Sequence, residues 1–317
     1  MQNIKPFYIA QPEQVRKRVN ELSKRSDEIK SRLAPILKKL WHPERQMAVV
    51  TQLDFFEDLI NRFPNFIEVI EIYETNAIGL ARLGLPFESP PILLQGEPGL
   101  GKTLFVSELA KLMALPYFEV SMATMTASFA LSGGNIQWSE GSVGFIAESL
   151  ATSQYANPII LIDELDKTGH DNRYNPISPF YTLLETHSAQ HFRDEALEFE
   201  IDASRVIWMA TANYINQVPP PILSRMRIIN IERPDEIQMI NVVNSIYSSF
   251  RKNKTIGQLL DPNLHADAMD LLRFKSPREA KLAIDEGCLK AIRHNRSILL
   301  PQDLPTNKKE SYHVGFI

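Results

Sequence analysis

The chain has 317 residues, with 34 lysines and arginines against 38 aspartates and glutamates, for a formal charge of −4. A hydrophobic fraction of 44% and a charged fraction of 23% are typical of a globular protein and exclude a wholly disordered chain. The mildly acidic balance weighs against nucleic acid and anionic membranes as partners. The single cysteine, Cys288, excludes an internal disulfide, and no apolar run approaches the roughly 18 residues of a membrane span. We therefore expect a cytoplasmic protein.

The first part of the chain is expected to be helical. Apolar residues recur at alternating spacings of four and three over 12–42, with Ser26 as the interruption, which predicts one long helix that is kinked or broken at Pro35. Such a seam is typical either of a helix that packs on its own domain or of a coiled-coil arm for assembly or partner docking. Two further helices are predicted, over residues 48–62 and 67–85.

From residue 92 the pattern changes to short apolar runs that alternate with helical stretches. The predicted strands are 92–95, 116–122, 158–163, 204–213 and 227–234. Strands separated by helices predict an α/β fold, with a parallel sheet and helices on its faces. After Pro234 the chain is helical to about residue 297. The expected divisions are an N-terminal helical region (1–88), an α/β core (89–233), a second helical domain (234–300) and a tail (301–317).

A phosphate-binding loop is predicted where the first strand of the core ends. The sequence there fits G-x-x-x-x-G-K-[ST], between a strand and a helix. Glycines allow backbone N–H groups to surround phosphate oxygens, and the helix directs its positive end to the same anion. Lys102 is expected to reach the β- and γ-phosphates, and Thr103 to place its hydroxyl on Mg²⁺. The predicted loop consists of Gly96, Glu97, Pro98, Gly99, Leu100, Gly101, Lys102 and Thr103.

A pair of carboxylates follows the strand at 158–163. A buried parallel strand that ends in acids places them at the carboxyl edge of the sheet, beside the phosphate loop. Asp163 suits a role in holding Mg²⁺ through water, and Glu164 suits the polarisation of a water that attacks the γ-phosphate. The alternative is that both are surface acids that close a strand. For Asp166 and Lys167 we expect a local ion pair.

These two motifs, with a helical domain behind them, resemble the AAA+ ATPases, and more closely the ATPase module of Lon proteases. The resemblance covers about residues 92–297, and its specific segments are IDELDK, NPISPF to MATAN, and VPPPILSRMRII. It implies a P-loop NTPase (AAA+) core with a helical lid and an N-terminal helical extension. It also implies that the cofactors are ATP and Mg²⁺ and that subunits assemble into a homo-oligomeric, hexameric ring.

Three polar residues match positions that act in AAA+ catalysis. Asn213 matches the sensor that orients the attacking water, and Arg278 in SPREAK matches the lid arginine that contacts bound nucleotide. Arg225 matches the arginine finger that reaches the γ-phosphate of a neighbouring subunit. The chain departs from the family at Ser224, where Lon commonly has an acid, and Arg227 is the alternative finger.

The segment from 131 to 144 resembles the loop with which Lon grips its substrate. Trp138 falls where that family has an aromatic residue, on a loop with glycines on either side. The resemblance implies that its ring presses on an unfolded polypeptide in a central pore. The alternative is that Trp138 packs into its own domain, as most tryptophans do.

The resemblance implies an ATPase that converts ATP and water to ADP and phosphate. A Lon protease carries a peptidase domain after the lid, and the residues after 297 are too few for one, so a motor without its own protease is expected. The favoured function is a ring-forming motor that remodels or unfolds polypeptides. The alternative is an ATP-dependent assembly switch or scaffold that regulates a separate effector, such as a peptidase or a nuclease. A DNA-directed motor is disfavoured by the acidic charge.

Overall fold

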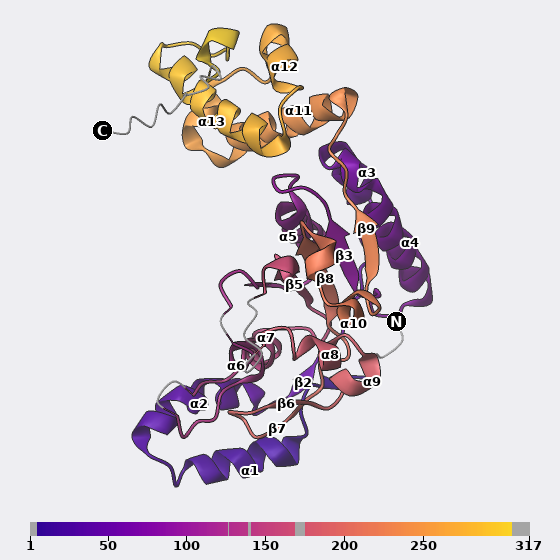
Figure 1. Cartoon of the computed structure of the whole chain (residues 1–317), viewed down its shortest axis with the longest axis vertical. Helices are drawn as coiled ribbons and strands as arrows, with labels where there is room; N and C mark the ends of the chain where they lie inside the picture. Colours follow the sequence, from indigo (N-terminus) through magenta and orange to yellow (C-terminus); the bar gives the residue numbers. More distant parts are fainter. Residues whose placement is uncertain (1–4, 126, 139–140, 169–174, 306–317) are drawn as a thin grey trace, which may run out of the picture. The chain divides into compact units, whose positions relative to one another are not determined.

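The chain forms two compact units, which are described separately (Figure 1). The structure is a computed structural model, and the residues that it describes are 5–125, 127–138, 141–168 and 175–305. The first unit contains the described parts of 1–59, 66–98 and 102–231. The second unit contains those of 60–65, 99–101 and 232–317. Most of the predicted tail, residues 306–317, lies outside the described residues.

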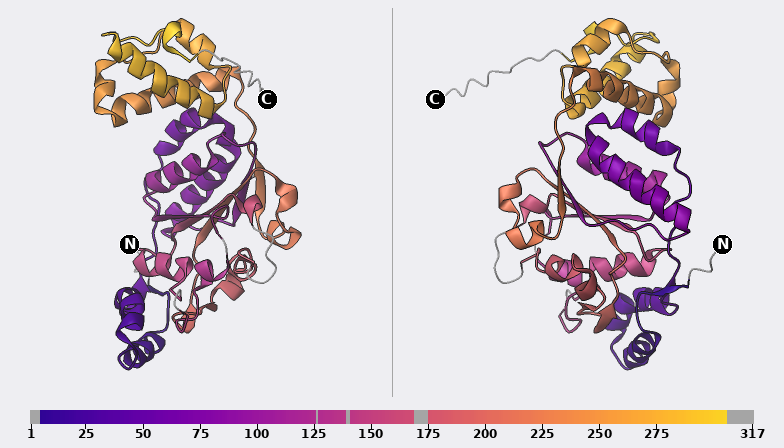
Figure 2. Two further views of the ribbon diagram at one scale, coloured as in Figure 1. Left: turned by 60° about the vertical axis from the view of Figure 1, so that its left-hand side comes forward. Right: turned by 90° about the vertical axis from the view of Figure 1, so that its right-hand side faces the viewer.

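A five-stranded parallel sheet is the centre of the first unit, as the alternating pattern predicts. Its strands are β3 (Ile92–Gln95), β4 (Tyr117–Ser121), β5 (Ile159–Asp163), β8 (Ile207–Ala212) and β9 (Arg227–Asn230). They are arranged in the order β4-β5-β8-β3-β9. Strands β5 and β8 have neighbours on both sides and helices on both faces, which explains why their sequences are continuously apolar (Figure 2).

Alternate residues of β5 lie on different faces of the sheet. Ile160 and Ile162 of β5 lie in one core with Leu150 of α7 (Phe145–Thr152). On α5 (Lys102–Leu112), Phe105 stacks on Phe66, with ring centroids 4.4 Å apart. Ile159 and Leu161 of β5, which alternate with Ile160 and Ile162, are buried outside that core, because successive side chains of a strand point to opposite faces.

The predicted helix over 12–42 is wrong as a single element. The chain forms α1 (Pro12–Leu22) and α2 (Asp27–Leu40), with a break at 23–26. Ser26 is the N-cap of α2, and its hydroxyl accepts a hydrogen bond from the Ile29 N–H at 3.5 Å. Pro35 lies inside α2 without ending it. The apolar seam packs on its own unit, because its buried residues belong to the core that contains β5 and α7.

The helix predicted over 48–62 is also wrong in its first half. Helix α3 (Phe55–Arg62) begins later, because the preceding backbone bonds to a buried side chain. The Ala48 N–H donates to Asn157 Oδ1 at 2.8 Å, and Asn157 Nδ2 donates to the carbonyls of Ala48 and Phe87 at 3.0 and 2.9 Å. These bonds hold residue 48 outside any helix. Helix α4 (Ile67–Leu83) agrees with its prediction.

Several short elements complete the first unit, and the sequence did not predict them. Strand β6 (Phe192–Asp194) pairs with β7 (Phe199–Ile201) as an antiparallel hairpin, and β1 (Phe7–Tyr8) pairs with β2 (Glu44–Arg45). The short helices are α6 (Phe129–Ser132), α8 (Phe180–Leu183), α9 (Thr186–Ala189) and α10 (Pro220–Leu223).

The second unit is helical, as predicted. It contains α11 (Glu236–Asn253), α12 (Ala266–Leu272) and α13 (Pro277–Arg293). Ser276 and Glu279 form a capping box at the start of α13, where the serine–proline pair predicts a helix start. Cys288 is fully buried in the core of this unit, as a small apolar residue would be. Within the part of the chain that is described, none of the helices combines the length and apolarity needed to cross a bilayer.

Candidate functional site

The two predicted motifs meet at the carboxyl edge of the sheet. Asp163 ends β5, and Thr103 lies in the first turn of α5. The Thr103 hydroxyl donates to the Asp163 carboxylate, with Oγ1 3.0 and 3.1 Å from its two oxygens. The hydroxyl of Thr211, near the end of β8, donates to the same carboxylate at 2.5 Å. The adjacent hydroxyl and carboxylate fit Mg²⁺, which prefers oxygen ligands and uses one or two carboxylates in phosphate sites.

The ammonium group of Lys102 is buried at the same edge. Its Nζ donates to the carbonyl oxygens of Gly96 and Glu97 at 2.6 and 2.9 Å, and to Asn213 Oδ1 at 2.9 Å. The residue is only 7% exposed, so burial lowers the pKa of Lys102, while the nearby acids, Asp166 first among them, oppose this shift. Three oxygen acceptors therefore stabilise a buried cation at the place where the motif predicts phosphate oxygens.

Glu164 leaves the strand in an uncommon backbone conformation. Its φ of 54° and ψ of 47° are in the left-handed region, which is costly for a residue with a side chain. Its N–H donates to the hydroxyl of Thr211 at 2.9 Å, and Ser121 Oγ lies 3.4 Å from its Oε2. Strands β8 and β4 are the two neighbours of β5. Thus Thr211 of β8 holds the backbone of Glu164, and Ser121 of β4 contacts its carboxylate.

Asp166 fixes the chain that follows β8. Its buried carboxylate accepts hydrogen bonds from the backbone N–H groups of Asn213 and Tyr214, at 3.1 and 3.2 Å. The predicted ion pair with Lys167 is present only at 4.0 Å. Asp166 therefore has a second role that the sequence analysis missed, since it positions the residue whose side chain meets Lys102.

Two hydroxyl residues of this edge were also missed. Thr211 and Ser121 both lie close to the carboxyl ends of their strands. Thr211 carries a usable signal, because it is a polar side chain inside an otherwise apolar strand, two residues before Asn213. Ser121 carries no comparable signal, since a serine at the end of a strand is common at the surface.

The two finger candidates both have acidic partners within the first unit. Arg225 Nε lies 2.8 Å from Glu185 Oε1, and its Nη1 donates to the carbonyl of Pro221 at 2.5 Å. Arg227 Nη2 lies 3.3 Å from Glu68 Oε1. The structure therefore pairs both arginines with acids that are not among the residues at the carboxyl edge of the sheet, and the choice between the two arginines remains a prediction.

The remaining predicted residues lie in the second unit or on the surface of the first. Arg278 is in the first turn of α13. Gly99 and Gly101 of the predicted phosphate loop have φ of 85° and 93°, a conformation in which a side chain would be strained. Trp138 is 53% exposed, so its ring does not pack into the core of its own unit.

Part of the chain matches a family of known proteins. Residues 92–233 match the family described as "ATPase family associated with various cellular activities (AAA)". The chain is similar to the Lon protease of Wolbachia pipientis, with 27% identity over 229 residues that cover 72% of this chain and 28% of that protein. It is also similar to the peroxisomal Lon protease homolog 2 of Zea mays, with 33% identity over 142 residues, or 45% of this chain and 16% of that protein. The chain thus spans less than a third of the length of these relatives.

A solved structure shares the fold. It is a closed-state cryo-electron microscopy reconstruction of Hsp104 with ATPγS and FITC casein. The TM-score is 0.61 at 14% sequence identity, and the match covers 86% of this chain and 50% of that one. The likeness at this identity concerns the fold, an α/β P-loop architecture with a central parallel sheet.

Proposed function

We propose that the chain hydrolyses ATP to remodel polypeptides, because residues 92–233 match the AAA ATPase family and the chain is similar to part of Lon proteases. The observation that carries this proposal is the cluster at the carboxyl edge of the sheet. There the Lys102 ammonium contacts Asn213, and the Thr103 hydroxyl contacts Asp163. A cation, an oxygen pair for a metal and an adjacent Glu164 are the groups that phosphoryl transfer to water requires.

Each of these groups has a defined task in the proposed reaction. Lys102 exchanges its present oxygen acceptors for β- and γ-phosphate oxygens and neutralises their charge. Glu164 accepts the proton of the attacking water, and the Asn213 amide orients that water. Thr103 and Asp163 would hold Mg²⁺, which when bound neutralises the charge that develops on the transferred phosphoryl group. The phosphate loop from Gly96 to Gly101 and Arg278 of the lid complete the proposed nucleotide contacts.

We further propose that the protein acts as a homo-oligomeric, hexameric ring. Arg225, or Arg227 in its place, supplies its guanidinium to the γ-phosphate bound by the neighbouring subunit. Exposed Trp138 contacts an unfolded polypeptide in the pore. The structure of the Hsp104 neighbour, which was determined with casein, supports a polypeptide as the class of substrate.

The variant Glu164→Gln tests the proposed chemistry. It keeps the size of the side chain and removes the proton acceptor, so it should bind ATP normally and hydrolyse it at least a hundredfold more slowly, as is typical for loss of a general base (roughly 10²–10⁴-fold). Glu200→Gln is a matched control, because Glu200 is an exposed acid on β7 that contacts His191. Normal hydrolysis by Glu164→Gln would refute the assignment of the base.

The ATPase rate of the wild type with and without unfolded casein tests the proposed role. Stimulation by casein that is lost in Trp138→Ala supports the remodelling motor. If the protein forms a ring and casein does not change its ATPase rate, the assembly switch or scaffold that regulates a separate effector is favoured instead. Stimulation by DNA would contradict both functions.

A further inference from the structure

The loop that carries Trp138 is folded back on itself. We call residues 133–138 and 141–144, between α6 and α7, the Trp138 loop. The Trp138 N–H donates to the Asn135 carbonyl at 3.0 Å, and the Gly141 N–H donates to the Trp138 carbonyl at 3.0 Å. A Cβ on Gly141 would overlap the Asn135 carbonyl oxygen, so the fold of the loop requires glycine there. Two backbone hydrogen bonds thus link the described residues of the Trp138 loop, while the Trp138 side chain is exposed.

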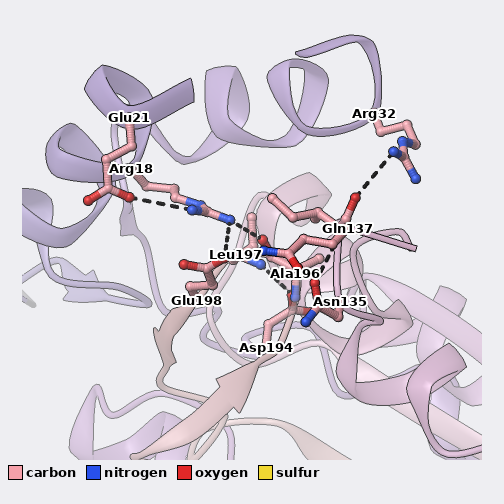
Figure 3. A network of polar contacts seen from close by, with 10 residues as sticks. Arg18, Glu21, Arg32, Asn135, Gln137, Asp194, Ala196, Leu197 and Glu198 are labelled. Carbon is pink, nitrogen blue, oxygen red and sulfur yellow. Dashed lines mark hydrogen bonds and ion pairs between the residues drawn. The ribbon is translucent and has the colours of Figure 1, made fainter. Parts of the chain in front are cut away.

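Arg32 of α2 holds this loop from outside. Its Nη1 donates to the carbonyl oxygens of Trp138 and Gly141 at 2.9 and 2.8 Å, and its Nη2 donates to the carbonyl of Ile136 at 3.3 Å. Figure 3 shows the guanidinium reaching from its helix towards the loop. One planar cation therefore joins three carbonyls of the loop, an arrangement that suits a guanidinium better than an ammonium group.

The hairpin of β6 and β7 holds the other end of the same loop. Asp194 Oδ2 accepts a hydrogen bond from the Gly144 N–H at 2.9 Å, while its Oδ1 accepts from the N–H groups of Ala196 and Leu197 at 3.0 and 2.9 Å. Arg18 of α1 donates to the carbonyl of Ala196 at 2.8 Å (Figure 3). Arg18 of α1 thus contacts the turn between β6 and β7, and Arg32 of α2 contacts the Trp138 loop itself.

We propose that the N-terminal arm, defined as α1 and α2, positions Trp138 for contact with polypeptide, and that Arg32 is the positioning residue. This inference rests on the proposed function, in which Trp138 touches the substrate. Arg32 itself does not touch substrate. It acts by fixing three carbonyls of the loop, so that binding of a polypeptide does not have to order the loop first.

Arg32 differs from the residues that hold the arm on its unit. The arm is anchored by buried apolar side chains of α2, such as Leu33 and Leu37, which belong to the core of the unit. The Arg32 side chain remains 22% exposed, pairs with exposed Glu28 of the same helix at 3.7 Å and bonds to the loop. Its removal should therefore release the loop without detaching the arm.

The test compares Arg32→Ala and Arg32→Lys with the matched control Lys30→Ala. Lys30 lies on the same helix and contacts Asp27 at 3.1 Å within that helix. Hydrogen exchange of peptides that cover the loop measures its order without any activity. The casein concentration that gives half-maximal ATPase stimulation measures the grip on substrate.

We expect Arg32→Ala to accelerate exchange in the loop and to raise the half-maximal casein concentration roughly tenfold, with the maximal stimulated rate retained, as for loss of a charged hydrogen-bonding group. Arg32→Lys should restore part of both, because one ammonium cannot reach all three carbonyls in the fork geometry. Lys30→Ala should match the wild type. Unchanged exchange in Arg32→Ala would overturn the inference.

The two readouts separate this inference from the function on which it rests. If casein fails to stimulate the wild type, the proposed function falls, and the exchange data alone still decide whether Arg32 orders the loop. If casein stimulates the wild type and Arg32→Ala requires no more casein than the wild type, the positioning role is refuted while the function stands.

Discussion

The side-chain oxygen of Asn213 accepts a hydrogen bond from the ammonium of Lys102 at 2.9 Å. This contact joins the residue after β8 to the first residue of α5, so the predicted sensor and the predicted phosphate-binding lysine occupy one site. The lysine is buried and Asn213 supplies one of its three oxygen acceptors. If Lys102 moves to bind phosphate, its hydrogen bond to Asn213 therefore changes directly.

The first prediction concerns this pair. Lys102→Ala should weaken ATP binding by roughly a hundredfold, because it removes charge-assisted bonds to phosphate. Asn213→Ala should retain ATP binding and lower the hydrolysis rate, because the amide orients water. Titration with a fluorescent ATP analogue, together with phosphate release, separates the two effects. Lys111→Ala, on the last turn of the same helix, is the control. Equal loss of binding in both variants would contradict this division of roles.

The second prediction concerns Asp166. Asp166→Ala leaves two backbone N–H groups without their acceptor, and should lower the free energy of unfolding by about 1–3 kcal/mol. It should also slow hydrolysis, because Asn213 loses its support. Urea denaturation and the ATPase rate measure the two effects. A variant that is destabilised yet hydrolyses ATP normally would show that Asp166 has no part in positioning Asn213.

The third prediction distinguishes the two finger candidates. Arg225→Ala should bind ATP normally and lose hydrolysis by roughly a thousandfold, the effect expected of an arginine finger. Arg227→Ala should lose only its exposed pair with Glu68, and should remain active. Nucleotide binding and the ATPase rate of the assembled protein decide between them. The reverse result would assign the finger to Arg227, and failure of Arg225→Ala to bind ATP would point to a structural role.

The fourth prediction is a dependence of stability on pH. Burial raises the pKa of Asp194 to about 6 from an ordinary 3.8, although backbone N–H groups of Leu197, Gly144 and Ala196 bond to it. The folded chain therefore binds this proton more tightly than the unfolded chain. The resulting stability is complete below pH 3.8 and is lost as the pH rises through about 6.

Asp194→Asn provides the comparison for this prediction. From about pH 4 to about pH 7, the unfolding free energy of the wild type should fall by roughly 2 kcal/mol relative to that of the variant, at 1.36 kcal/mol per pKa unit. Urea denaturation of both proteins across this range measures the difference. A difference that stays constant with pH would show that the Asp194 carboxyl titrates at its ordinary pKa.

The local sequence pattern predicted the strands of the sheet and the residues that meet at its carboxyl edge. Strand β3 ends where the motif requires, and Asp163 lies beside Thr103 because parallel strands share one carboxyl edge. The predicted helix over 12–42 was wrong because periodicity records which residues are apolar, and does not record that residues 23–26 leave the helix. Asn157 similarly holds Ala48 outside any helix across a separation of 109 residues.

The sequence by itself determined the α/β class, the glycine-rich turn after β3 and the two acids at the end of β5. These follow from contiguous residues whose spacing reflects local geometry. Only the tertiary structure decided that Arg32 meets the Trp138 carbonyl, 106 residues away, and that Asp194 holds the Gly144 N–H. In these contacts the side chains of Arg32 and Asp194 bond to backbone groups. A backbone group leaves no residue-specific signal in the sequence. A backbone carbonyl is the same at every position, so the choice of partner is made by the fold.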